Sequence, residues 1–372
     1  MADVDPEESA TRPADRRDLR RGWTTGACAT AAARAAYQAL LTGVFPNPVA
    51  IALPRGERPS FAVACGELGA GWARAAIIKD AGDDPDITHG ALIVVEVARG
   101  AEGGGVVFKA GEGVGTVTLP GLSLAPGEPA INPAPRGMIR QTIGEIAGAF
   151  GGSGDVMVTI SIPGGVELAK KTMNARLGIV GGLSILGTTG VVIPYSCSSW
   201  IHAIQRGVDV ARAAGRGHIA ACTGSTSEAA VQSLYGLPEV ALIDMGDFAG
   251  GLLKYLRSHP VPRLTIAGGF GKLSKLAAGH LDLHSGRSSV DSVALMSLLR
   301  EIGAPDEALH AVAGATTAGQ IMAAAGASWG PRLAEQVARR ARETALAALA
   351  GGVAVDVAVF DRGGVLLGHA GP

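Results

Sequence analysis

The chain has 372 residues, too many for one typical hydrophobic core, so its length favours two domains. A hydrophobic content of 47% with 17% charged residues excludes an intrinsically disordered chain. A net charge of −1 without a Lys/Arg-rich block argues against nucleic-acid binding, although a few local cations could still hold an anionic ligand.

The first 18 residues are polar and lack the apolar core of a signal peptide, so we expect a disordered tail. Four widely spaced cysteines without a CxxC pair indicate free thiols, and therefore a cytoplasmic protein. Leu177 to Ile201 carries no charged side chain. Its five glycines and Pro194 are costly in a helix, so we do not predict a membrane span.

The first ordered segment, from about Leu19, predicts a glycine turn followed by an Ala-rich helix. Thr24 or Thr25 can cap this helix, and Gly43 can end it. The N–H groups of its first turn could receive a carboxylate. An ordinary capped helix is the alternative.

Strands are expected at Val49–Leu53, Phe61–Ala64 and Trp72–Ile78. An acidic segment, residues 79–90, follows them and precedes a buried strand at Ala91–Val97. This segment contains Lys79, Asp80, Asp83 and His89. It lacks the spacing of a calcium loop, so no metal site is predicted. Asp80 could hold His89 in one tautomer, which would make the two a proton-handling pair. A turn rich in Asp, because Asp caps turns, is the alternative.

Residues 103–139 are expected to be dominated by turns, with a helix at Pro135–Phe150 and a strand at Asp155–Ile162 after them. The first half, residues 19–198, is therefore predicted as an α+β domain with a glycine-rich centre. The glycines of that centre let the backbone approach something flat or bulky. They are Gly181, Gly182 and those of the Gly187–Gly190 turn, which also contains Thr188 and Thr189. Tight turns packed against a neighbouring domain are the alternative.

In the second half, residues 199–372, strands alternate with helices. This alternation predicts an α/β, doubly wound, Rossmann-like domain with a parallel sheet. The expected strands are His218–Cys222, Val240–Met245, Arg263–Ala267, Val353–Phe360 and Val365–Gly368. The expected helices are Ser199–Ala214, Val290–Ile302, Pro331–Leu349 and one after each of the first three strands.

Ligands of such sheets collect at the carboxyl ends of the strands. There we expect a cofactor site made of Thr223, Gly224, Ser225, Thr226, Asp244, Gly246, Asp247, Gly268, Gly269 and Gly271. An acidic residue after the second strand suits a ribose diol, and the first turn lacks the GxGxxG of dinucleotide sites. S-adenosylmethionine, with ribose and adenine but no pyrophosphate, fits better. Short strand–helix loops with ordinary caps are the alternative.

Several motifs together resemble the CbiD family, the cobalt-precorrin-5B C1-methyltransferases of anaerobic cobalamin biosynthesis. They are spread over about residues 19–283 and are jointly specific. They comprise RGWTTGAC from Arg21, KDAGDDPDITHG from Lys79, GEGVG from Gly111, GEPAINP from Gly127, the segment Asn174–Gly190, TGS from Thr223, GDF from Gly246 and GGFGK from Gly268.

The resemblance implies transfer of a methyl group from S-adenosylmethionine to ring carbon C1 of cobalt-precorrin-5B, which gives cobalt-precorrin-6A. The cobalt would enter with this anionic tetrapyrrole, so no protein metal is needed. The transfer is an in-line displacement that mainly needs positioning and exclusion of water. The family supplies no established catalytic residues. Our hypothesis is that Asp80 or His89 acts as the base that sets the ring tautomer.

Lone cations and helix N-termini are the expected partners of the substrate's carboxylates. The expected substrate-binding residues are Thr24, Thr25, Lys79, Asp83, Lys170, Arg176, Gly181, Gly182, Thr188, Thr189 and Lys272. Lys171, beside Lys170, is a further candidate, and a solvated helix face is the alternative for both.

Two other classes of function stay open at this point. A nucleotide-dependent enzyme would bind ATP or NAD through the glycine turns. A tetrapyrrole carrier or scaffold would bind the macrocycle without the methyl donor. An Ala/Gly-rich surface could also support a homodimer.

Overall fold

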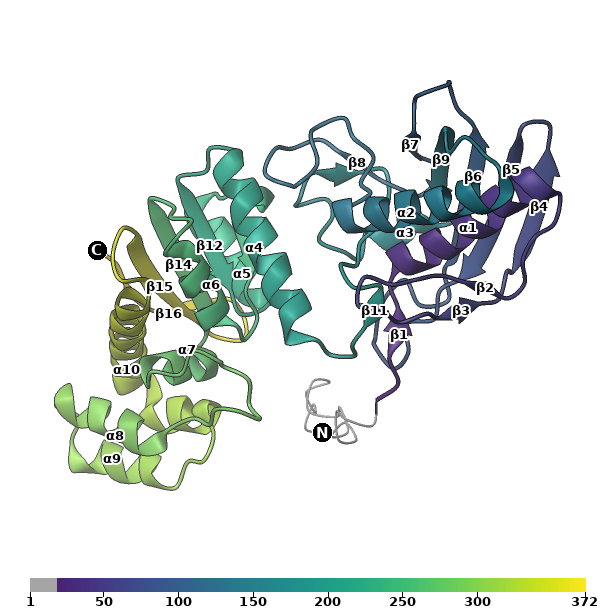
Figure 1. Ribbon diagram of the computed structural model, residues 1–372. Coiled ribbons are helices and arrows are strands. Elements are labelled where there is room, and N and C mark those ends of the chain that lie inside the picture. The colour runs from purple at the N-terminus through teal and green to yellow at the C-terminus, as the bar shows by residue number, and fades with distance from the viewer. Residues whose placement is uncertain (1–18) are drawn as a thin grey trace. The chain divides into compact units, whose positions relative to one another are not determined.

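The computed structural model describes residues 19–372 (Figure 1). The expected tail at residues 1–18 lies outside the described residues. The described chain is a mixed α/β protein whose sheets contain both parallel and antiparallel strands. It divides between Ser196 and Cys197 into two compact units, called unit 1 and unit 2 below.

Unit 1 is built on a five-stranded sheet and three helices. Its helices are α1 (Thr25–Thr42), α2 (Pro133–Phe150) and α3 (Gly165–Ala169). Its strands are β1 (Gly22–Trp23), β2 (Val49–Ala50), β3 (Ser60–Phe61), β4 (Cys65–Gly69), β5 (Trp72–Ile78), β6 (Leu92–Arg99), β7 (Val106–Ala110), β8 (Thr116–Val117), β9 (Val156–Ser161), β10 (Ile179–Val180) and β11 (Val191–Val192).

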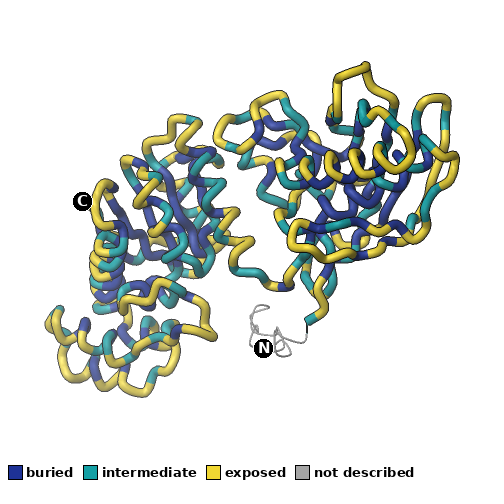
Figure 2. The backbone as a smooth tube through the Cα atoms, in the orientation of Figure 1, coloured by how far each residue is buried: buried dark blue, intermediate teal, exposed yellow. Residues whose placement is uncertain are grey.

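The sheet of unit 1 has the order β4-β5-β6-β9-β7, in which only β7 and β9 are parallel. Helices α1 and α2 cover one face (Figure 1), and the core between them and the sheet is buried (Figure 2). Alanines fill most of the buried side of α1, which lets the helix lie close to the strands. On the opposite face Arg74 of β5 lies between Glu67 of β4 and Glu96 of β6 and forms ion pairs with both.

Unit 2 alternates strands and helices. Its strands are β12 (His218–Cys222), β13 (Leu242–Asp244), β14 (Arg263–Gly269), β15 (Ala354–Phe360) and β16 (Leu366–Ala370). Its helices are α4 (Cys197–Ala213), α5 (Ser225–Tyr235), the 3-10 helix η1 (Glu239–Ala241), α6 (Ala249–Leu256), α7 (Phe270–Ala277), α8 (Ser292–Glu301), α9 (Asp306–Ala313) and α10 (Ala318–Leu349).

The sheet of unit 2 has the order β13-β12-β14-β15-β16, and its first four strands are parallel. Helix α5 packs against one face, whereas α4, α6, α7 and α10 pack against the other. Alternate strand residues therefore enter two different apolar cores. The carboxyl ends of β12, β13 and β14 lie side by side, which groups the loops that follow them.

The last strand differs from the expected all-parallel sheet, because β16 runs antiparallel to β15. Only a short turn separates the two strands, and a parallel return would need a crossover of a dozen or more residues. Asp361 fixes this turn, since its carboxylate accepts hydrogen bonds from the N–H groups of Gly363 and Val365.

Several further elements were not predicted. Strand β7 lies within the stretch expected to be dominated by turns, where the flanking glycines hide a strand of five residues. Strand β4 and helix α9 were also missed. Helix α10 begins at Ala318 and not at Pro331, and it is interrupted by Gly326, whose φ of 64° is not helical.

Candidate functional site

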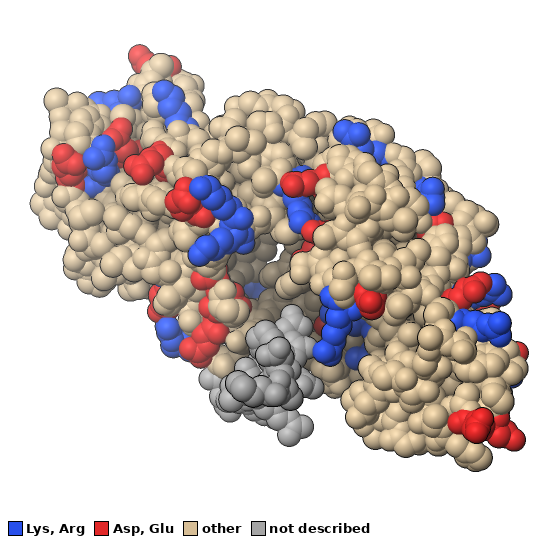
Figure 3. Space-filling view, turned by 180° about the vertical axis from the view of Figure 1, so that it is seen from behind, with Lys and Arg blue, Asp and Glu red and all other residues tan. Residues whose placement is uncertain are grey.

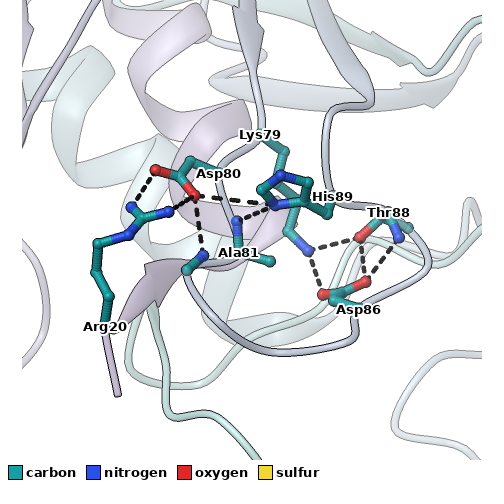
Figure 4. Close-up of polar contacts among 8 residues, drawn as sticks. Arg20, Lys79, Asp80, Ala81, Asp86, Thr88 and His89 are labelled. Carbon is teal, nitrogen blue, oxygen red and sulfur yellow. Dashed lines mark hydrogen bonds and ion pairs between the residues drawn. The ribbon is translucent and has the colours of Figure 1, made fainter. Parts of the chain in front are cut away.

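The acidic segment of unit 1, residues 79–90, folds into a loop around Asp80 (Figure 4). Both carboxylate oxygens of Asp80 bind the guanidinium of Arg20, one of them at 2.9 Å from Nη2. The N–H of Gly82 donates to the same carboxylate at 2.9 Å. The bonds from Arg20 and Gly82 lower the pKa of Asp80 to about 2. Asp80 is therefore ionised at neutral pH and is a weak proton acceptor in this arrangement.

His89 lies beside Asp80, as its spacing suggested, with Nδ1 at 3.8 Å from Oδ1 (Figure 4). Its Nδ1 accepts a hydrogen bond of 3.1 Å from the N–H of Ala81. An acceptor at Nδ1 places the proton of the neutral ring on Nε2. The imidazole is half exposed, and with Nδ1 occupied as an acceptor its Nε2–H is the donor that remains.

Lys79 is placed differently from the expected substrate-binding cation, because its side chain is only 1% exposed. The ammonium binds Asp86 and the hydroxyl of Thr88. Thr88 in turn donates its N–H and its hydroxyl to Asp86 at 2.7 and 2.6 Å. Burial works to raise the pKa of Asp86, but Lys79 and Thr88 outweigh it and lower that pKa. This network favours a role for Lys79 in shaping the loop.

Hydrogen bonds from backbone N–H groups tie the acidic loop to two distant segments. The carboxylate of Asp83 accepts from the N–H of Arg20 at 2.6 Å, and Asp84 accepts from the N–H of Tyr195 at 2.9 Å. The N–H of Trp23 donates to the carbonyl of Asp80 at 2.7 Å. The loop, the start of the described residues and the end of the glycine-rich segment therefore meet in unit 1.

The first turn of α1 is closed rather than open to an anion. Thr24 is the N-cap and accepts from the N–H of Ala27 at 3.1 Å, and both Thr24 and Thr25 are buried. The N–H of Gly26 donates to the carbonyl of Leu186. A Cβ at Gly187 would lie 2.3 Å from that of Thr24, so the Gly187–Gly190 turn packs directly on the cap. The structure thus favours the ordinary capped helix.

The other expected substrate residues of unit 1 lie in two settings. Gly182 packs against the carbonyl of Gly113, whereas Gly181 and Thr188 are exposed and Thr189 is half-buried. Lys170 is exposed and ion-paired with Glu167 at 2.6 Å, as on a solvated helix face. The remaining two cations occupy the stretch between α3 and β10, where Lys171 is exposed and Arg176 half-buried.

In unit 2 the expected cofactor residues gather at the carboxyl edge of the sheet. The N–H of Thr223 donates to Ala267 of β14, and a Cβ at Gly268 would lie 2.7 Å from the hydroxyl of Thr223. Gly224 and Gly269 precede α5 and α7, and a Cβ on either would meet open space. Ser225 and Thr226 are exposed in the first turn of α5, and Gly271 lies near Ala318.

Asp247 completes this edge and carries an unsatisfied oxygen. Lys272, expected to bind substrate, instead lies here, with Nζ 3.3 Å from Asp247 Oδ1 and 2.9 Å from the carbonyl of Thr223. The Lys272 contact is an ion pair without hydrogen-bond geometry, so buried Oδ1 of Asp247 lacks a hydrogen-bond donor. Such an atom is suited to accept from a ligand hydroxyl. Asp244 and Gly246 stand directly before it.

Two family profiles match the chain. The profile described as CbiD matches residues 12–194, and the profile described as the CbiD C-terminal domain matches residues 282–371. A protein of Bradyrhizobium sp. strain BTAi1 is 62% identical over 95% of this chain and 94% of its own length. Proteins of Brucella anthropi and Paramagnetospirillum magneticum are each 58% identical, over 95% and 96% of this chain and 96% and 99% of their own lengths. All three are named cobalt-precorrin-5B C(1)-methyltransferase.

The chain belongs to the CbiD family. The family named by its motifs is therefore confirmed. A crystal structure titled as the cobalamin biosynthesis protein cbiD of Archaeoglobus fulgidus is 30% identical and covers 72% of this chain and 83% of its own, with a TM-score of 0.39. The family assignment rests on the sequences.

Sequence reasoning missed two cations of this CbiD-family chain. Arg20 was not selected because its partner Asp80 is 60 positions away. Lys275 is buried, donates to the carbonyl of Leu283, and has its pKa lowered by burial. No local pattern marks either residue as functional.

Three further properties of this CbiD-family chain concern its surface charge, its possible metal ligands and its helix lengths. On the face seen in Figure 3, acidic and basic side chains are interspersed over a mostly uncharged surface. Within residues 19–372, no group of three or more His, Cys, Asp or Glu is placed to hold a metal ion. No helix in the same range is long and apolar enough to cross a membrane.

Proposed function

We propose that this chain transfers the methyl group of S-adenosylmethionine to C1 of cobalt-precorrin-5B and so produces cobalt-precorrin-6A in cobalamin biosynthesis. The observation that carries the proposal is the 62% identity to a relative of that name, over 95% of this chain. Identity of this extent covers the acidic loop and the strand ends of unit 2 alike, so both candidate sites fall within the shared sequence.

In this proposal unit 2, close to the expected domain 199–372, is a Rossmann-like domain that binds the methyl donor at its carboxyl edge. Two features support this location. The carboxylate of Asp247 is partly exposed and could accept hydrogen bonds from the ribose hydroxyls. Gly224 and Gly269 leave open space before α5 and α7, where the methionine carboxylate would meet helix N–H groups. Lys272 would balance charge at this edge through Asp247.

Unit 1, close to the expected domain 19–198, would bind the anionic cobalt-tetrapyrrole beside the acidic loop. The guanidinium of Arg20 is well exposed and suits a bidentate bond to an acetate or propionate arm. Thr188 and Gly181 expose backbone along which a flat ring could lie. The buried Thr24, Thr25 and Gly182 would support this surface from behind, and Asp83 would hold the backbone of Arg20 in place while its side chain stays free to move.

The proton roles follow from the hydrogen bonds of the loop. His89 accepts a hydrogen bond at Nδ1 and is half exposed, so we propose that its Nε2–H donates a hydrogen bond to the substrate. Asp80 is a weak acceptor while Arg20 binds it. A substrate carboxylate that draws Arg20 away would raise the pKa of Asp80 and make it the base. In this scheme Asp80 takes the proton that sets the ring tautomer.

Two further expectations belong to the same proposal. A cytoplasmic location is supported by the four cysteines, none of which forms a disulfide in the described structure. A homodimer stays a prediction that light scattering of the purified chain can test.

The experiment is a donor-dependent assay of the intact chain with cobalt-precorrin-5B. We expect S-adenosylhomocysteine to form only when both substrates are present, and Asp247→Asn to weaken donor binding about tenfold or more, through lost hydroxyl bonds. A chain that binds the tetrapyrrole but forms no S-adenosylhomocysteine would instead be a carrier.

A further inference from the structure

An exposed tryptophan stands at the end of β13, in the first turns of α4. Trp200 is 46% exposed although it is one of the largest apolar side chains of unit 2. Its indole Nε1–H donates to the carbonyl of Asp244 at 3.3 Å. A Cβ added to Gly246 would lie 3.3 Å from the indole ring, so the ring rests on the backbone at that glycine. Phe248 supports it from the side, with ring centroids 6.3 Å apart.

These contacts fix the ring without burying it. The Asp244 bond uses the only polar group of the indole, and Gly246 leaves room because it carries no side chain. An aromatic face held rigidly and left open loses little conformational freedom when a flat ligand stacks on it.

The neighbouring residue indicates which flat ligand this is. Asp247 follows Gly246 directly, and its carboxylate is partly exposed, with Oδ1 ion-paired to Lys272 at 3.3 Å without hydrogen-bond geometry. A flat surface beside a partly exposed carboxylate matches a heteroaromatic ring joined to a diol, as in a nucleoside. An apolar partner peptide would cover the indole but would offer no donor to the carboxylate.

We propose that Trp200 is the platform on which the adenine of the methyl donor stacks while Asp247 accepts the ribose hydroxyls. The inference rests on the proposed function, in which unit 2 binds the donor. It adds a residue that the strand-end pattern did not select, because Trp200 comes from the helix before the first strand of the sheet.

The test measures binding of S-adenosylhomocysteine to the full chain by calorimetry and by tryptophan fluorescence. Stacking on an aromatic ring contributes enough for Trp200→Ala to weaken binding by about tenfold to a hundredfold. Trp200→Phe keeps an aromatic face and should retain most of the affinity, but it should lose the quenching of indole emission that adenine causes in the unaltered chain. Trp72→Ala, in unit 1, is the matched control and should change neither the affinity nor that quenching.

The outcomes separate the inference from the function on which it rests. Unchanged affinity in Trp200→Ala, with methyl transfer intact in the unaltered chain, would overturn the platform and leave the function standing. Equal losses in Trp200→Ala and Trp200→Phe, with no quenching in the unaltered chain, would also overturn it, since the indole would then only support the fold. Absence of binding to the unaltered chain would overturn the donor site and the platform together.

Discussion

Replacing Lys79 by methionine tests whether this lysine shapes the acidic loop or binds substrate. The ammonium is 1% exposed and has two partners, Asp86 and Thr88. Removing one member of a buried ion pair costs about 3–5 kcal/mol, because the other charge is left without a partner. Asp86 is 24% exposed and keeps its two bonds from Thr88, which places the loss at the lower end, about 3 kcal/mol.

The assay is urea denaturation followed by far-UV circular dichroism, with Asp86→Asn and the double variant completing a cycle. The double variant Lys79→Met/Asp86→Asn also removes the Asp86 carboxylate that Lys79→Met leaves without a partner. It should therefore regain about 1–2 kcal/mol of the stability that Lys79→Met loses. Lys170→Met is the matched control. It breaks an exposed pair with Glu167, and such pairs contribute about 1 kcal/mol or less.

The result that would refute this reasoning is a Lys79→Met variant of unchanged stability whose KM for the tetrapyrrole rises sharply. Lys79 would then reach the substrate as a free cation, and the buried pair would not describe the working enzyme. Loss of stability with a nearly normal KM in the double variant would support the loop-shaping role.

Three further outcomes follow from the two sites. Asp80→Asn should lower kcat by about a hundredfold with little change in donor affinity, because proton transfer by a positioned side chain contributes about 10²–10⁴-fold; an unchanged kcat would remove Asp80 from the mechanism. Gly268→Ala should destabilise unit 2 by about 1–3 kcal/mol, because the added Cβ would lie 2.7 Å from the hydroxyl of Thr223. The control Gly269→Ala places its Cβ in open space and should be near neutral in the same thermal melt. Equal effects of the two substitutions would contradict the geometry. The bonds from Arg20 and Gly82 lower the pKa of Asp80 to about 2. The stability that the ionised Asp80 carboxylate adds to the fold is therefore present above about pH 4 and is lost as the pH falls towards 2. The deficit in melting temperature of Asp80→Asn should therefore shrink over that range, and a constant deficit would argue against this linkage.

Local sequence patterns predicted the elements that depend on local chemistry. Strands β5 and β12 have the expected bounds, and α1 begins after Thr24 and ends before Gly43, as the cap residues require. The proximity of Asp80 and His89 was also predictable, because one loop of a few residues carries both, but the N–H of Ala81 and not Asp80 is the hydrogen-bond partner of Nδ1.

Contacts between distant segments could not be read in the same way. The charge of Lys79 suggested an exposed cation, whereas Asp86 and Thr88 allow it to be buried. The Arg20–Asp80 pair and the position of Trp200 over Gly246 depend on tertiary structure that no local pattern specifies. These contacts decide how the candidate residues can act.

The most direct measurement is mass spectrometry, with carbon NMR, of the product made from cobalt-precorrin-5B and S-adenosylmethionine carrying a ¹³C methyl group. The account predicts a product heavier by one labelled methyl, bonded to C1, with one S-adenosylhomocysteine formed for each. A tetrapyrrole that binds but acquires no label, or acquires it at another carbon, would contradict the account.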